Sequence, residues 1–203
     1  MNSSPLKSAA LALVAAGLLI GVGMLIHPDD DDPASVTMSL WGTAHWLITV
    51  GAVLGLFGLT GLFATWLQTD GTLGLLAYVL TSVGMTLIVA FALFEAAVVA
   101  PIASLPEAAA LLEEAGPIFG GPLGLVFLVT IAALGIGTLL LGFLLYRGRH
   151  VPPAAAMMVA VGGPLLSVSD WLPYVLDVAS GVLLGLGLAW VGWVLWQRQT
   201  AAA

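Results

Sequence analysis

Long apolar runs separated by short polar segments make up almost all of this 203-residue chain. Each run provides about the 20 apolar residues that an α-helix needs to cross the hydrocarbon core of a bilayer. The pattern therefore predicts a single-domain, all-α integral membrane bundle of six transmembrane helices, which leaves no room for a soluble catalytic domain. The six spans are expected at about residues 8–26, 39–67, 73–100, 118–146, 154–169 and 172–197.

The segments between the runs carry signals for where helices end and begin. Pro101 is expected to close the third span. Ser104 and Glu107 have the spacing of a capping box, which predicts a short external helix over residues 104–115. Gly162, Gly163 and Pro164 are expected to break the short fifth span, which is tolerable at membrane depth only where neighbours or water satisfy the freed backbone groups.

Charged residues divide unevenly between the two ends of the predicted bundle. All the basic residues fall on the side of both termini, namely Lys7, Arg147, Arg149 and Arg198. Most acids fall on the other side, namely Asp29, Asp30, Asp31, Asp32, Glu107, Glu113, Glu114 and Asp170. Because cytoplasmic loops carry the excess of Lys and Arg, a multi-pass protein of the cell membrane with both termini in the cytoplasm is expected.

Composition narrows the classes of partner and chemistry. Hydrophobic residues make up 61% of the chain and charged residues 7%, far from the usage of soluble domains. The absence of cysteine excludes disulfides, thiolate metal sites and cysteine nucleophiles. A net charge of −7 disfavours nucleic acid and attracts cations. The expected partner is the lipid bilayer, while a homo-oligomer or a partner in a membrane complex stays open.

Ionisable side chains inside the predicted spans lie at similar heights. Counted at about 1.5 Å per residue from the basic ends of their helices, His45, Glu95 and Asp177 all lie roughly 29 to 33 Å along. His27 and Asp170 fall at or just above that level. Because such groups are costly in a membrane, they usually face a partner or a water-filled cavity. The sequence therefore predicts an outward-facing polar pocket in which these five residues are candidates for binding a metal or handling protons.

Three functions fit such a pocket, namely binding of a cation or metal, coupled transport, and a structural role in a membrane complex. None of them is an enzyme activity. Imidazole with carboxylates suits zinc, iron, manganese or copper, so the leading hypothesis is a protein that binds a cation or a divalent metal, with His45 and Glu95 as first ligands. A b-type haem held by His27 and His45 is less favoured, because the outer side has no Lys or Arg to pair with its propionates. No sequence pattern of a hydrolase appears, and no catalytic residue is predicted.

Two alternatives to static binding remain open. The first is a small proton- or cation-coupled transporter in which Glu95 and Asp177 titrate. The second is a structural accessory subunit of a membrane complex, because groups this close to the lipid headgroups can also bond to loop backbones at modest cost.

Short motifs in the first half of the chain carry a resemblance. They are His27-Pro28 at the exit of the first helix, Trp41 with Ala44-His45-Trp46 at the entrance of the second, and Leu93-Phe94-Glu95-Ala96 near the end of the third. In these motifs the chain resembles a broad group of uncharacterised prokaryotic polytopic membrane proteins, mainly over residues 10–100. The resemblance implies a fold of about six helices and no particular reaction.

Overall fold

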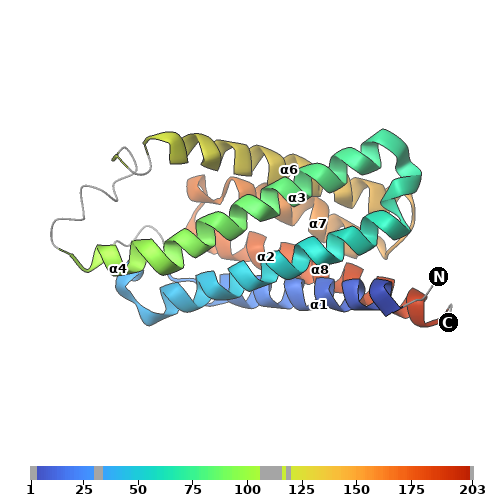
Figure 1. The fold of residues 1–203 in the computed structure, drawn as a ribbon, viewed down its shortest axis with the longest axis horizontal. Helices are drawn as coiled ribbons and strands as arrows, with labels where there is room; N and C mark the ends of the chain where they lie inside the picture. Colours follow the sequence, from blue (N-terminus) through green and yellow to red (C-terminus); the bar gives the residue numbers. More distant parts are fainter. Residues whose placement is uncertain (1–3, 30–33, 106–115, 118–119, 202–203) are drawn as a thin grey trace.

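The computed structural model describes residues 4–29, 34–105, 116–117 and 120–201, and its regular elements are all helical (Figure 1). The six main helices occupy the six apolar runs. They are α1 (Ser4–Leu25), α2 (Ser39–Thr65), α3 (Gly71–Phe94), α6 (Pro122–Arg147), α7 (Pro153–Ser167) and α8 (Tyr174–Ala201). Within the described part, five of them are long and apolar enough to cross a membrane, whereas α7 is shorter. The all-α prediction with six helices is confirmed, and only five reach spanning length.

The six helices pack side by side in a closed ring. Helix α1 contacts α2 and α8, and the ring continues from α8 through α7 and α6 to α3, which returns to α2. The beginning of α1 and the end of α8 lie at the same end of the molecule (Figure 1). This arrangement encloses a central space that all six helices can line.

Small residues allow the helix backbones to approach closely. A Cβ added to Gly17 of α1 would overlap the backbone of Gly185 and Ala189 in α8. A Cβ added to Gly84 of α3 would lie 2.6 Å from the Cα of Leu134 in α6. Lipid tails are as apolar as leucine, so helices in a bilayer associate largely through such close packing.

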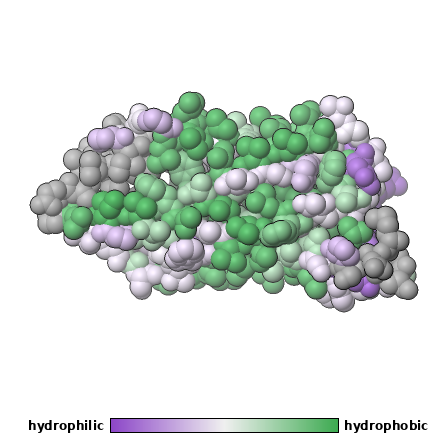
Figure 2. All heavy atoms as spheres, in the orientation of Figure 1, coloured by the Kyte–Doolittle hydropathy of each residue, from purple (hydrophilic) through white to green (hydrophobic). Residues whose placement is uncertain are grey.

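The outside of the ring is apolar along most of its length. Figure 2 shows hydrophobic residues over the middle of the molecule and strongly hydrophilic residues gathered at the end where the termini lie. Large side chains such as Leu75, Val79, Leu125 and Leu139 are exposed on α3 and α6. Lipid can cover this apolar surface. By the length and composition of its helices, the chain is a multi-pass integral membrane protein.

Pro101 does not close the third helix, contrary to the prediction. The chain passes from α3 through a π-helical turn, η3 (Glu95–Val99), into α4 (Ala100–Ala103). The wider turn lets the N–H of Ala100 bond to the carbonyl of Glu95, so the α-helical ladder is already interrupted before the proline, which lacks an N–H. The residues predicted to form the external helix at 104–115 lie mostly outside the described residues.

Pro164 does not break the fifth helix in its middle, which corrects the second prediction from proline. It lies inside α7, which continues to Ser167. Since Pro164 is close to the end of the helix, its missing N–H removes only one late backbone bond. The chain then forms a 3-10 turn, η4 (Ser169–Trp171), before α8.

Candidate functional site

A cavity of about 180 Å³ lies inside the ring of helices. Its walls are mostly apolar, with side chains from all six main helices, including Ile20, Ile48, Met85, Phe127, Leu166 and Leu184. Polar side chains also reach it, namely His27, His45, Glu95, Thr130, Ser167, Ser169 and Asp177. An apolar pocket with a few convergent polar groups is the usual form of a site for a small ligand.

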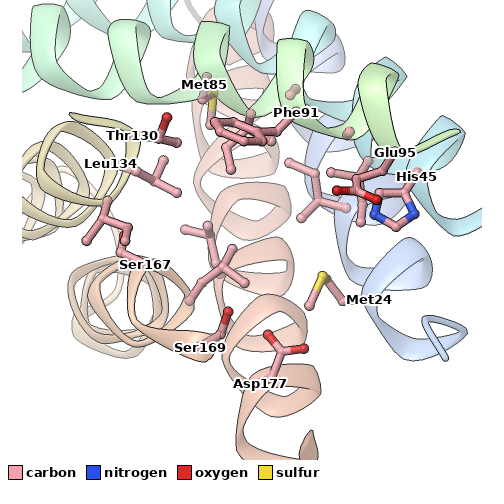
Figure 3. A pocket seen from close by; sticks show the side chains of 18 of the residues that line it. Met24, His45, Met85, Phe91, Glu95, Thr130, Leu134, Ser167, Ser169 and Asp177 are labelled. Atoms are coloured by element: carbon pink, nitrogen blue, oxygen red, sulfur yellow. The ribbon is translucent and has the colours of Figure 1, made fainter. Parts of the chain in front are cut away.

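Four of the five predicted site residues line this one cavity. His27 follows the end of α1, His45 lies in the second turn of α2, and Asp177 lies in the first turn of α8. Glu95 begins the π-helical turn η3. Figure 3 shows His45 and Glu95 in one part of the cavity, with Asp177 entering from α8. The side chain of Asp170, the fifth candidate, lies outside the described residues.

His27 and His45 face each other through their Nε2 atoms, which are 3.4 Å apart. The Nδ1 of His27 lies 2.8 Å from the carbonyl oxygen of Pro28, and the Nδ1 of His45 lies 2.8 Å from that of Trp41. A carbonyl oxygen only accepts hydrogen bonds, so both Nδ1 atoms donate. The two imidazole rings are thus fixed in the same tautomer, with Nε2 directed toward the partner ring.

Packing holds this pair of rings in place. His27 is 6% exposed and His45 7% exposed. The Trp41 ring packs against both, with its centroid 5.2 Å from that of His27 and 4.8 Å from that of His45. The hydroxyl of Tyr174 donates a 2.6 Å hydrogen bond to the carbonyl of His27, which ties the beginning of α8 to the end of α1.

The titratable groups that the described residues place on the cavity wall are two histidines and two carboxylic acids. Glu95 and Asp177 contribute the carboxyl groups, and Asp177 is only 8% exposed. Among the described residues that line the cavity, none is Lys or Arg. Carboxylate and imidazole groups are ligand types with which proteins hold cations.

Sequence reasoning missed part of the lining. Met24 and Phe91 line the cavity, and nothing in the sequence distinguishes such apolar residues from ordinary packing residues. Ser167 also lines it. Its hydroxyl donates a 2.8 Å hydrogen bond to the carbonyl of Gly163, which is a local helix contact.

The described residues do not supply a complete metal site by themselves. No group of three or more His, Asp or Glu side chains in that part of the chain is arranged to hold a metal ion. The pair of histidines is the part of the predicted site with the most definite geometry. A b-type haem does not fit between the two rings, because a macrocycle cannot enter a gap of 3.4 Å between facing nitrogen atoms.

His150 lies apart from the cavity, in the loop between α6 and α7. Its ring stacks on Trp66 with centroids 5.1 Å apart, and the guanidinium of Arg198 lies over the same tryptophan. Nearby, Arg147 forms an ion pair with Asp70. Burial lowers the pKa of His150 below 6.5, the Asp70 carboxylate raises it and Arg198 lowers it further.

Comparisons of the chain with protein-family models, curated proteins and solved structures find no match in any of the three. The resemblance noted in the sequence is thus supported only at the level of a protein with several helices, five of them long and apolar.

Proposed function

We propose that this membrane protein binds a cation at the polar end of its central cavity. The observation that carries the proposal is the convergence of His27, His45, Glu95 and Asp177, from four separate segments, on one cavity. Carboxylate and imidazole groups are common ligands of cations in proteins, and here both kinds of group converge on one enclosed space.

The shape of the cavity limits what the cation can be. A volume of about 180 Å³ admits an inorganic ion with a few waters or a small organic amine. Anionic ligands are disfavoured by the two carboxylates.

Glu95→Gln tests the proposal, because it removes one negative charge with little change in volume. The purified protein in mild detergent would be heated with and without Zn²⁺, Mn²⁺, Cu²⁺, Na⁺ and small amines. We expect at least one cation to raise the unfolding temperature of the wild type, since a ligand that binds only the folded state stabilises it. Glu95→Gln should weaken that binding by about fivefold or more, because one close charge is worth roughly 1 to 4 kcal/mol.

Asp70→Asn is the matched control, since it removes a carboxylate that pairs with Arg147 outside the cavity. It should lower the unfolding temperature of the unliganded protein while leaving the shift caused by the cation intact. Wild-type protein that no cation stabilises would contradict the proposal. Equal shifts in the wild type and Glu95→Gln would instead favour a structural role for these residues, as in an accessory subunit.

A proton- or cation-coupled transporter is the second candidate. One irregular helical segment that borders the cavity favours it, since Glu95 begins the π-helical turn between α3 and α4. Interrupted helices provide ion sites in many transporters, and flux into proteoliposomes distinguishes transport from static binding.

Both termini are placed in the cytoplasm in this proposal. The support is the set of basic residues at the ends of helices or in loops on the side of the termini, namely Lys7, Arg147, Arg149 and Arg198. The excess of Lys and Arg marks the cytoplasmic side of membrane proteins. With this orientation, the His27 and His45 end of the cavity faces the cell exterior.

A further inference from the structure

The geometry points to a transition-metal ion held between the Nε2 atoms of His27 and His45. This inference rests on the proposed function and names its ligand as a divalent first-row ion, with Zn²⁺ and Cu²⁺ as the best matches. It is carried by the tautomers of the two rings, the distance between them and the charge of the cavity.

The tautomers of the two rings match those of metal-bound histidines. Since both Nδ1 atoms donate to backbone carbonyls, each neutral ring has its lone pair on Nε2. Two lone pairs that face each other at 3.4 Å repel, unless a proton or a metal ion lies between them. Histidines that bind metals typically donate their other ring N–H to a backbone carbonyl or a carboxylate, which is the arrangement of both residues here.

The distance fits two ligands on a tetrahedral metal. With zinc–nitrogen bonds of 2.0 to 2.1 Å, two such ligands have their nitrogen atoms about 3.3 Å apart. The Nε2 atoms of His27 and His45 are already 3.4 Å apart. The burial of both rings and their packing against Trp41 would keep that spacing with little reorganisation on binding.

Charge and ligand type select the ion. Two acidic side chains, Glu95 and Asp177, line the same cavity and favour a dication over an anion, since electrostatic attraction is strong where the dielectric constant is low. Imidazole nitrogen suits Zn²⁺ and Cu²⁺, whereas Ca²⁺ and Mg²⁺ prefer oxygen ligands. Water molecules would complete the coordination, because the described side chains form no group of three ligands.

Cu²⁺ is a direct probe, because pulsed electron paramagnetic resonance detects the remote nitrogen of each imidazole bound to copper. The full chain would be purified without affinity histidines, stripped with a chelator and loaded with one equivalent of Cu²⁺. We expect the spectrum of two imidazoles in the wild type and of one in His27→Gln and in His45→Gln. His150→Gln is the matched control and should retain two, since His150 does not line the cavity.

Competition with a chelator measures Zn²⁺ binding on the same variants. Loss of either cavity histidine should weaken binding by more than about 100-fold, since even the loss of a group that only orients a metal ligand costs about 10- to 100-fold. Size-exclusion chromatography identifies variants that stay folded, and the wild-type spectrum tests the inference without any substitution.

Three outcomes would overturn the metal site. They are a wild-type copper spectrum with fewer than two imidazoles, full Zn²⁺ affinity in a folded His27→Gln or His45→Gln variant, and absence of metal binding. In the last case, ¹⁵N magnetic resonance would identify a proton shared by the rings. Stabilisation by an amine or Na⁺ that depends on Glu95 would then leave the proposed function intact, whereas no stabilisation by any cation would reject both.

Discussion

The chemistry of each histidine in this protein is set by the groups that its two ring nitrogens meet. His27 and His45 have their Nδ1 atoms fixed by carbonyls, so their Nε2 atoms are presented to each other. His150 is held instead by stacking on Trp66, close to Asp70 and Arg198. The same residue type therefore has a ligand geometry in one place and a packing role in the other.

The burial of His150 predicts a dependence of stability on pH. Its pKa is lowered in the folded protein, chiefly by burial, although Asp70 opposes the shift and Arg198 adds to it. Between the folded pKa and 6.5 the unfolded chain binds a proton that the folded chain does not, so stability rises with pH. The contribution is complete above about pH 6.5 and is lost as the pH falls through this window.

Unfolding temperatures of the wild type and His150→Gln between pH 5 and 8 measure this effect. The wild type should lose more stability than the variant on going from pH 7 to pH 5. The two proteins differ only at residue 150, so the difference between the two curves reports on the histidine. Identical pH profiles would show that the protonation of His150 is not linked to folding.

The heights of the site residues could be predicted from the sequence, but their mutual geometry could not. A rise of about 1.5 Å per residue places His45, Glu95 and Asp177 at one level, and the structure has all three on one cavity. Which way each side chain points around its helix depends on packing between helices. The approach of His27 to His45 depends further on the loop after α1, whose course no periodicity encodes.

At the scale of elements, the length of each apolar helix can be predicted from the sequence. The positions at which a helix is interrupted are harder to predict. The sequence predicts that Pro101 closes a helix and that Pro164 breaks one, but both lie inside helical segments. A proline interrupts the helix only where its missing N–H and its ring cannot be accommodated. The π-helical turn before Pro101 accommodates them, and that turn depends on contacts with α2 that a local reading does not include.

The contact between α1 and α8 predicts a strong effect of one methyl group. In Gly17→Ala the new Cβ would meet backbone atoms of Gly185 and Ala189, which cannot move without separating the helices. We expect a loss of about 1 to 3 kcal/mol of unfolding free energy, the usual cost of overpacking. Reversible unfolding in mixed detergent micelles measures it.

Gly42→Ala is the control for this substitution, since a Cβ at Gly42 meets nothing within 4 Å in α2. It should leave stability unchanged or raise it by up to about 1 kcal/mol, because alanine is the better helix former. If Gly17→Ala were as stable as Gly42→Ala, the close approach of α1 and α8 would not hold in solution.

At the scale of the whole molecule, the ring explains why a chain so apolar can keep ionisable groups in its interior. Lipid-facing residues such as Leu75 and Leu125 cover the outside, while Glu95 and Asp177 reach the cavity inside. Ionisable residues in membrane proteins are tolerated when they face such interiors. The ring therefore separates the lipid outside from the polar cavity inside by the thickness of one helix.

The orientation of this ring in the membrane is open to a direct test with topology reporters. With Lys7, Arg147, Arg149 and Arg198 on the cytoplasmic side, a fluorescent protein fused after Ala203 should fluoresce, and alkaline phosphatase at the same position should be inactive. The same reporters fused after Ser104, at the other end of the bundle, should give the opposite result. Active phosphatase after Ala203 would show that the protein has the opposite orientation. The cavity histidines would then face the cytoplasm, where the supply of transition metals is different. Equal reporter activity at both positions would mean that an even number of helices crosses the membrane between them, with the short α7 as the helix that fails to cross.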